Sequence, residues 1–326
     1  MSATPRHVVF GTGAVGRALT LALLRRGETG IRLVNRSGAV PQGVPPDRVE
    51  AVRGDAGDPR FTVGAARGAA VVYQVLNPPY DRWAAEFPAL QDAVLAAAEA
   101  TGARLVSMEN VYLYGRSGGR PFTEDSPHAA HTRKGRLRGE MSRALLAAHA
   151  AGRVEVAIGR ASDYYGPGGG AQSNLGDRVF SPALTGGTAT VLGDPDQPHT
   201  YTYVPDIGEG LAVLGLHPAA AGRAWHLPND PAPRTTRELV ALAYAAAGTA
   251  PARLRTPPWP VLRLAGLANA TLRELWEMRY EFAEPFVVDS SRIAAELGVT
   301  ATPYPAAVAR TLAAHRDGHR AAARAA

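Results

Sequence analysis

The sequence predicts an α/β fold, in which a doubly wound parallel sheet is joined to a smaller, mostly helical C-terminal domain. Two observations predict it. Short apolar runs alternate with alanine-rich helical segments that carry periodic leucines through the first half of the chain. A glycine-rich turn joins the first apolar run to the first of these helices. Right-handed crossovers would then place all strand carboxyl ends at one edge of the sheet.

The elements are expected in the following order. Strands are predicted at 7–11, 31–35, 48–53, 70–76, 103–108 and 153–159, with helices at about 14–26, 59–67, 81–101 and 131–151. Beyond residue 160 the alternation breaks, and a stretch rich in Gly, Pro, Ser and Asp predicts long loops up to residue 200. The later elements are a strand over 199–204, a helix capped by Asp206, helices over 235–247 and 261–282, a strand at 285–289, a helix at 291–297 and a frayed helical tail from His315 to Ala326.

The glycine-rich turn has the spacing G-x-G-x-x-G at Gly11, Gly13 and Gly16. Gly11 allows the tight turn, Gly13 lets a phosphate approach the backbone, and Gly16 lets the helix pack closely on the strand. Unpaired amides at the helix N-terminus would bind the anion. The turn therefore predicts a Rossmann-type dinucleotide site, formed by Gly11, Thr12, Gly13, Ala14, Val15 and Gly16.

The second expected strand ends at Asn35, Arg36 and Ser37, about where such folds contact the adenosine ribose. An acidic residue there would accept from the 2′-hydroxyl of NAD, whereas the Arg36 guanidinium suits a 2′-phosphate. The alternative is a solvated arginine in a turn. The sequence thus favours NADP(H) over NAD(H).

Three further strand ends carry polar or proline-rich motifs. Asp55 and Ala56 could contact adenine, although Asp55 could equally shape a turn. Asn77 and Pro78 lie in a loop beside the expected pyrophosphate, and Ser162 follows the sixth strand. We expect all of these residues to bind the cofactor. We also expect two domains: a dinucleotide-binding domain over 1–165, to which 201–225 returns, and a substrate-binding or lid domain over 166–200 and 226–326.

Composition narrows the possible functions of the 326-residue chain. It contains no cysteine, which excludes disulfides, thiolate catalysis and zinc–thiolate or iron–sulfur sites. We expect no metal site. The net charge is +6, but the arginines are dispersed, which argues against nucleic-acid binding. No apolar signal or membrane-length run precedes or interrupts the elements, so a cytoplasmic protein without a membrane partner is expected.

With these motifs together, the chain resembles the extended and atypical short-chain dehydrogenase/reductases, a group that includes nucleotide-sugar epimerases, dehydratases and related reductases. The resemblance covers nearly the whole length and is specific for the superfamily, not for a substrate. Beyond the glycine turn it rests on Gly54-Asp55, Val106 to Gly115, Thr123 to Pro127, Arg160 to Gly168 and Tyr203 to Ile207.

The resemblance implies a catalytic Ser, Tyr and Lys, with the Tyr four residues before the Lys so that both share a helix face. Lys134 matches the lysine, which would bind the nicotinamide ribose and lower the pKa of the tyrosine. The tyrosine position is Ala130, and Met108 stands where the serine is expected, with Ser107 on the opposite face of the strand. The chain thus departs from the family at the proton donor.

Three explanations remain open. Another phenol could donate the proton, and the candidates Tyr112, Tyr114, Tyr164 and Tyr165 all follow expected strands; a phenol near Lys134 would have a lowered pKa. His131 could be the acid instead. A substrate such as an iminium ion would need no protein acid. Substrate contacts are expected from Asn110, Asp163, Tyr165, Asn174 and Tyr201.

The sequence therefore predicts an NADPH-dependent oxidoreductase that transfers hydride to a small organic carbonyl or imine-like substrate. One alternative is an epimerase or dehydratase of the nucleotide-sugar type that uses NAD(P) transiently. Another is a non-catalytic NADP-binding sensor or scaffold. A homodimer formed through the helices at 81–101 and 131–151 is possible.

Overall fold

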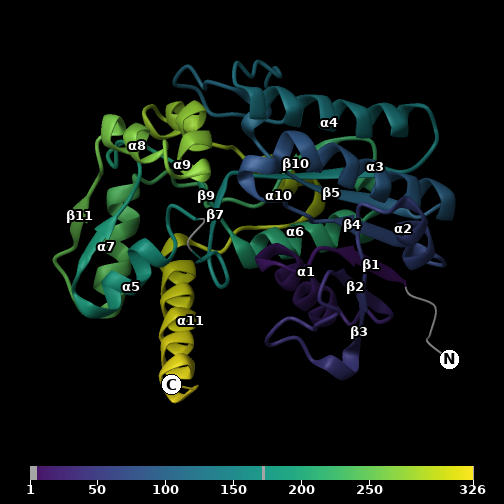
Figure 1. Cartoon of the computed structure of the whole chain (residues 1–326), viewed down its shortest axis with the longest axis horizontal. Helices are drawn as coiled ribbons and strands as arrows, with labels where there is room; N and C mark the ends of the chain where they lie inside the picture. Colours follow the sequence, from purple (N-terminus) through teal and green to yellow (C-terminus); the bar gives the residue numbers. More distant parts are fainter. Residues whose placement is uncertain (1–5, 171–172, 326) are drawn as a thin grey trace.

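A seven-stranded parallel sheet forms the centre of the computed structural model, which describes residues 6–170 and 173–325, with side chains up to residue 318 (Figure 1). The strand order is β10-β6-β5-β4-β1-β2-β3, and it reverses between β1 and β4, where such sheets bind ligands. The predicted doubly wound sheet is confirmed. Its strands are β1 (His7–Phe10), β2 (Ile31–Asn35), β3 (Val49–Arg53), β4 (Val71–Gln74), β5 (Arg104–Asn110), β6 (Val156–Ala161) and β10 (Ala224–His226).

Helices cover both faces of this sheet because its strands place apolar side chains alternately on each side. Val9 and Val106 pack with α1 and α6 on one face, while Val8 and Leu105 pack with α2, α3 and α4 on the other. Each face has its own buried apolar cluster. The helices are α1 (Ala14–Arg25), α2 (Pro59–Ala66), α3 (Trp83–Thr101), α4 (Arg133–Ala150) and α6 (Val204–Leu216), with short 3-10 turns at η1 (Pro46–Arg48), η2 (Tyr80–Arg82), η3 (Tyr112–Tyr114) and η5 (Pro218–Ala220).

A second lobe lies beside the carboxyl edge of the sheet, on the left of Figure 1. Its core joins α5, α7 and α11 to the short strands and includes Phe180, Tyr201, Val240 and Tyr304. A capping box in which Thr235 and Glu238 bond to each other's backbone amides starts α7. The elements outside the main sheet are β7 (Asp163–Tyr165), β8 (Thr188–Thr190), β9 (Tyr201–Tyr203), β11 (Arg253–Arg255), α5 (Asp177–Thr185), α7 (Thr236–Ala247), α8 (Trp259–Ala265), α9 (Ala270–Leu275), η6 (Trp276–Phe282), α10 (Ser291–Leu297) and α11 (Tyr304–Ala325).

The structure corrects several expectations for the second half. The helix predicted over 261–282 is broken into α8, α9 and η6, because Asn269 caps a new helix start. The strand predicted at 285–289 is reduced to isolated bridges of Phe286 and Val288. Asp206 lies inside the first turn of α6 instead of capping it, and accepts from Thr302 N and Oγ1. The tail expected to fray continues α11 as far as Ala325, and Ala326 lies outside the described residues.

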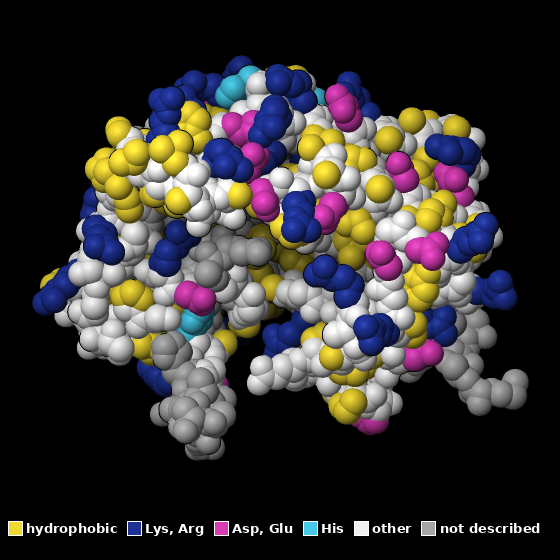
Figure 2. All heavy atoms as spheres, viewed as in Figure 1, with side chains coloured by type: hydrophobic (Ala, Val, Ile, Leu, Met, Phe, Trp, Pro, Cys, Tyr) yellow, Lys and Arg dark blue, Asp and Glu magenta, His cyan; other side chains and the backbone are white. Residues whose placement is uncertain are grey.

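Exposed apolar side chains gather on α8 and just beyond its end, where Figure 2 shows them at the upper left. Val261, Leu264 and Leu267 are 57%, 70% and 78% exposed. Among the described helices, none combines the length and apolar character that crossing a membrane requires. The described residues also contain no group of three or more His, Asp or Glu side chains suited to a metal ion.

Candidate active site

The glycine turn has the geometry that its spacing predicts. Gly11 has φ +102°, and a Cβ there would lie 2.8 Å from the carbonyl oxygen of Val75. A Cβ on Gly16 would lie 2.0 Å from the carbonyl oxygen of Gly11, so only glycine allows this approach of helix and strand. At Gly13, by contrast, an added Cβ would meet no atom within 4 Å. Close packing below the turn and open space at its tip fit the binding of a pyrophosphate.

Two further features surround this open space. The first helical bond of α1 runs from Arg17 N to Gly13 O at 2.9 Å, which leaves the preceding amides, including those of Ala14 and Val15, without helical partners. Gly168, in the loop after β7, lies close to Ala14, where a Cβ on Gly168 would be 3.3 Å from that of Ala14. The chain thus brings a second glycine-rich loop against the turn that carries Thr12.

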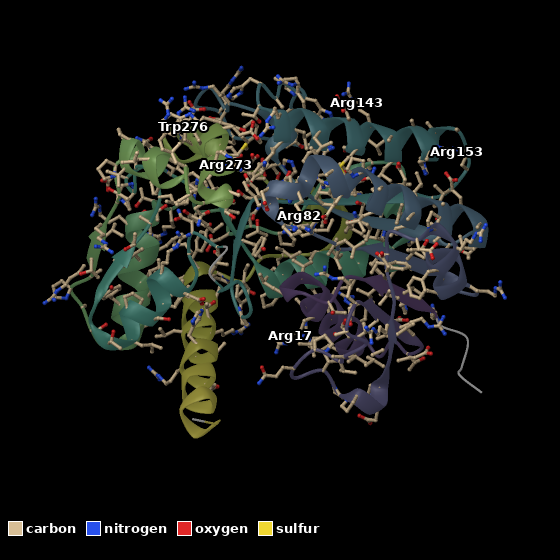
Figure 3. The ribbon with its side chains drawn as sticks, viewed as in Figure 1. Arg17, Arg82, Arg143, Arg153, Arg273 and Trp276 are labelled. Carbon is tan, nitrogen blue, oxygen red and sulfur yellow. The ribbon has the colours of Figure 1, made fainter. Side chains whose placement is uncertain are left out.

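The three predicted cofactor residues at the end of β2 have different surroundings in the structure. Asn35 Oδ1 accepts from the amides of Ser37 and Gly38 at 3.0 and 2.6 Å, and from Ser37 Oγ at 2.8 Å. Asn35 and Ser37 therefore shape the turn. Arg36 is exposed, and no described residue bonds to its guanidinium. Arg17 lies on the side of α1 that faces the second lobe, and its Nε donates to Gln42 O at 2.6 Å (Figure 3).

The next two strand ends hold their loops by local contacts. Asp55 Oδ1 accepts from Gly57 N at 2.9 Å, which is the turn role weighed for this residue, and Ala56 is buried. After β4, Pro78 O accepts from Trp83 Nε1 at 3.2 Å, which fixes the loop containing Asn77 against the start of α3.

Lys134 lies in the first turn of α4 and is only 5% exposed. Its ammonium is bound by the carboxylate of Glu274, lies 3.7 Å from Glu277, and sits 4.5 Å from the centre of the Tyr80 ring. Both glutamates come from α9 and η6, about 140 residues away in sequence. In the described structure, the second lobe therefore covers the lysine.

The backbone of Tyr112 lies next to Ala130, the position at which the family's tyrosine is missing. A Cβ on Gly135 would be 2.6 Å from both Ala130 Cβ and Tyr112 O, so these residues converge at the start of α4. Tyr112 and Tyr80 both contact the Trp83 ring, at 5.9 and 5.0 Å between centroids. The sequence did not single out Tyr80. Its position after a strand end was the one available signal.

The pKa values of these two phenols contradict the expectation of a lowered value near Lys134. Burial raises the pKa of Tyr80 and of Tyr112 well above the ordinary range. The lysine charge is paired with Glu274 and Glu277. Both tyrosines stay protonated at neutral pH and can donate a proton but not readily accept one.

Other candidate residues have structural partners elsewhere. Tyr114 is buried, and its hydroxyl contacts His226 Nε2 at 2.7 Å and accepts from Arg160 at 2.8 Å. Arg160 also contacts Glu109 at 3.3 Å and donates to Ser142 at 2.8 Å. His131 is exposed, with its ring 4.7 Å from that of Tyr280. The structure therefore does not bring the Tyr114 hydroxyl to Lys134.

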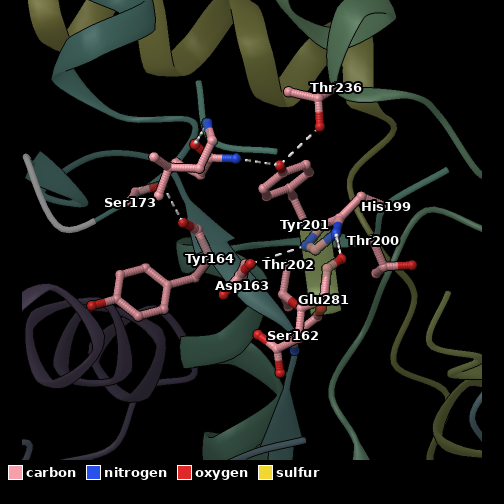
Figure 4. A network of polar contacts seen from close by, with 12 residues as sticks. Ser162, Asp163, Tyr164, Ser173, His199, Thr200, Tyr201, Thr202, Thr236 and Glu281 are labelled. Carbon is pink, nitrogen blue, oxygen red and sulfur yellow. Dashed lines mark hydrogen bonds and ion pairs between the residues drawn. The ribbon is translucent and has the colours of Figure 1, made fainter. Parts of the chain in front are cut away.

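The predicted substrate contacts divide into two groups. Tyr165 is packed in the core of the second lobe, and the Tyr201 hydroxyl bonds to Thr236 at 2.9 Å and to Asn174 at 3.0 Å. Asn174 also accepts from Leu192 N at 2.9 Å. These three residues hold the lobe together. The Tyr164 ring points toward the N-terminal elements in Figure 4 and packs against the cluster shared by α1 and α6.

Asn110, Ser162 and Asp163 do lie at the carboxyl edge. Asn110 Oδ1 accepts from Tyr112 N at 3.3 Å. Ser162 N donates to Thr202 Oγ1 at 3.0 Å, while its buried hydroxyl has no partner among the described residues. Asp163 Oδ2 lies 3.0 Å from Nε2 of His199, a residue that sequence analysis did not select (Figure 4).

Comparison with known proteins agrees with this architecture. The family model for the NAD dependent epimerase/dehydratase family matches residues 8–227. A curated relative, the uncharacterized protein y4nL of Sinorhizobium fredii (strain NBRC 101917 / NGR234), is 27% identical over 191 residues. That match covers 56% of this chain and 51% of the relative, so the match spans about half the length of that protein.

Solved structures show the same fold at low identity. A dTDP-glucose 4,6-dehydratase from Streptomyces venezuelae, DesIV, determined with NAD bound, is 20% identical with a TM-score of 0.76, covering 95% of this chain and 97% of that one. The epimerase Mth375 of Methanothermobacter thermautotrophicus is 17% identical with a TM-score of 0.80, covering 97% and 94%.

Proposed function

The chain belongs to the NAD dependent epimerase/dehydratase family, and on that premise we propose that it is an NADPH-dependent oxidoreductase acting on a small organic carbonyl or imine-like substrate. One observation carries the proposal: an open glycine turn lies at the same sheet edge as the free guanidinium of Arg36. The turn suits a dinucleotide, and the guanidinium suits its 2′-phosphate.

The chain's own residues would divide the work as follows. Gly11 to Gly16 would hold the pyrophosphate, and Arg36 would hold the 2′-phosphate. When bound, NADPH supplies a hydride. Lys134 would exchange its glutamate partners for ribose hydroxyls, and the second lobe would exclude water from the transfer. Tyr112, which is protonated and whose backbone lies beside Ala130, is one candidate proton donor.

An epimerase or dehydratase acting on a nucleotide sugar is the second candidate, favoured by the family and by the names of the similar structures. Such chemistry first oxidises a substrate alcohol, which needs a base. Ala130 removes the usual one, and the raised pKa of Tyr112 makes it a poor replacement. A protein that binds NADP without catalysis is the third candidate.

Cofactor turnover separates these candidates. Purified protein would be incubated with NADPH and a panel of aldehydes, ketones and cyclic iminium ions, and separately with NAD and UDP-glucose or dTDP-glucose, with Gly16→Val as the control for background oxidation. We expect NADPH consumption with a member of the first panel. Conversion of a nucleotide sugar without net cofactor consumption would contradict the oxidoreductase proposal and support the epimerase or dehydratase. Tight NADPH binding with no turnover on either panel would support the sensor.

A further inference from the structure

His199 is a buried histidine that none of the roles above uses. It lies just before β9, and its side chain is 4% exposed. The rings of Phe282 and Phe286 stack on it at centroid distances of 5.4 and 5.3 Å, and the Tyr201 ring lies 4.5 Å away. These three contacts fix the plane of the imidazole.

Both ring nitrogens of His199 face acceptors. Nδ1 lies 3.2 Å from the backbone oxygen of Glu281, and Nε2 lies 3.0 Å from Asp163 Oδ2. A carbonyl oxygen can only accept, so Nδ1 carries a proton. A neutral imidazole would then turn a bare Nε2 toward a carboxylate oxygen, and the two lone pairs would repel.

The pair therefore contains one proton more than a neutral histidine and an ionised aspartate would have. The proton is either on Nε2, giving an imidazolium beside a carboxylate, or on Asp163, which then donates to Nε2. In both arrangements the pair is neutral overall and holds a proton that it can release. No lysine or arginine among the described residues pairs with Asp163 to change this count.

The groups around the pair bring no positive charge to it. The Glu281 carboxyl is buried, and burial, followed by the charge of Asp163, raises its pKa well above the ordinary range. It accepts from the Tyr280 hydroxyl at 3.4 Å. Tyr80 and Tyr112 interact electrostatically with Asp163 and remain neutral. None of these neighbours offers a positive charge that would displace the proton.

Asp163 connects this pair to the carboxyl edge of the sheet. It comes two residues after the end of β6, beside Ser162, and its side chain is 21% exposed, whereas that of His199 is almost fully covered. No described residue hydrogen-bonds to Asp163 Oδ1. One carboxylate oxygen thus holds the histidine, and the other is available to a substrate.

We propose that Asp163 and His199 form a proton-donating dyad that serves the reduction in place of the tyrosine absent at position 130. The inference rests on the proposed oxidoreductase function. The hydride forms a C–H bond at the carbonyl carbon, and the π electron pair moves to oxygen. That oxygen takes the one proton that the dyad holds. The Asp163 side chain turns its protonated oxygen from His199 Nε2 toward the substrate, its O–H bond breaks as the new O–H bond forms, and the dyad is left as a neutral imidazole and a carboxylate that solvent reprotonates. Asp163 is the catalytic residue and His199 the positioning residue.

Two probes separate proton donation from the other roles of the site. Reduction of benzaldehyde needs a hydride and a proton, whereas N-methyl-3,4-dihydroisoquinolinium needs a hydride only. We expect Asp163→Asn and His199→Gln to lower kcat for the aldehyde by about 100-fold or more. Turnover of the iminium ion and the Kd for NADPH should stay close to the wild-type values. Asp196→Asn, which removes an exposed aspartate paired with Arg237, is the matched control and should change neither reaction.

Either of two results would overturn the dyad: kcat of the variants falls equally with the aldehyde and the iminium ion, or kcat for the aldehyde is unchanged. A second measurement needs no turnover. Nitrogen-15 and carbon-13 NMR at pH 7.5, with His199 assigned from His199→Gln, should show either an imidazolium or a protonated Asp163. A neutral ring beside an ionised carboxylate overturns the dyad. If the wild type reduces neither probe, the oxidoreductase function fails, while the NMR result still decides whether the dyad holds its proton.

Discussion

The start of α1 and the start of α4 lie at the same edge of one sheet, but their polar groups are used in opposite ways. At α1 the space beyond Gly13 is open, and the backbone amides of the first turn, before Arg17, have no helical partners. At α4 the Lys134 ammonium is already held by Glu274 and Glu277. The first region is prepared for a ligand, and the second must exchange partners to receive one. Under the proposed function, in which Lys134 binds the cofactor ribose, cofactor binding and the contact with the second lobe would compete for this lysine.

The largest expected effect comes from filling the glycine turn. In Gly16→Val, the new Cβ would collide with the carbonyl oxygen of Gly11, which cannot move without distorting the turn. We expect NADPH binding to fall below detection by fluorescence titration, with a loss of about 1–3 kcal/mol in the free energy of unfolding.

Gly64→Ala is the matched control for this variant. Gly64 lies within α2, where an added Cβ would meet nothing within 4 Å. It should bind NADPH normally and gain up to about 1 kcal/mol of stability from helix propensity. Tight NADPH binding by Gly16→Val would contradict the assignment of the turn.

A substitution of Lys134 tests the other region of the comparison, the start of α4. Lys134→Met leaves Glu274 and Glu277 beside Arg133 without their buried cation, and we expect a loss of about 3–5 kcal/mol in the free energy of unfolding by urea titration. Adding Glu274→Gln should recover part of that loss, because it removes one of two carboxylates that would then share Arg133 as their cation.

The control is an ion pair beyond the far end of α4, where Arg153 and Glu99 lie 3.0 Å apart and are 53% and 27% exposed (Figure 3). Arg153→Met should cost no more than about 1 kcal/mol. Equal losses from the two substitutions would show that the lysine cluster contributes no more than a surface pair.

A pH titration tests the buried network that contains Tyr114. Burial lowers the pKa of His226 to about 4, against 6.5 in the unfolded chain. As the pH falls from 6.5 toward 4, only the unfolded state takes up this proton, so stability is lost across that window, by up to about 3 kcal/mol. The free energy of unfolding of His226→Gln should lack this part of the pH dependence. Parallel curves for the two proteins would rule out a neutral buried His226.

The tyrosines at 112 and 114 give a smaller contrast. Tyr114→Phe removes a hydroxyl that serves both Arg160 and His226, and should cost about 1–3 kcal/mol of stability without changing cofactor binding or turnover. Tyr112→Phe should cost less stability than Tyr114→Phe. Among the described residues, the Tyr112 hydroxyl has no hydrogen bond to a buried charged group that the substitution would break. A drop in turnover for Tyr114→Phe alone would show that the wrong phenol has been placed at the site.

The parts of the site that the sequence could predict are those with local causes. Gly11 and Gly16 are required by the backbone of one short turn, and Arg36 directly follows a strand whose place follows from that turn. Six of the seven parallel strands follow from alternation along the chain, whereas β10 was not predicted. These inferences need only neighbouring residues.

The parts that were missed depend on distant segments. Glu274 reaches Lys134 across about 140 residues, and His199 reaches Asp163 from another loop. No spacing rule links such pairs, because their contact is set by how the second lobe packs on the sheet. The raised pKa of Tyr112 likewise comes from burial in the folded chain, which no local spacing reveals.

The central claim is that a 2′-phosphorylated dinucleotide binds between the glycine turn and Arg36. Isothermal titration of NADPH and NADH into the wild type, Arg36→Ala and Arg67→Ala tests it directly; Arg67 is also exposed but follows α2 just before β4, at the opposite edge of the sheet. We predict that the wild type and Arg67→Ala bind NADPH about tenfold or more tightly than NADH, and that Arg36→Ala loses this preference. Equal affinities in the wild type, or an unchanged preference in Arg36→Ala, would contradict the account.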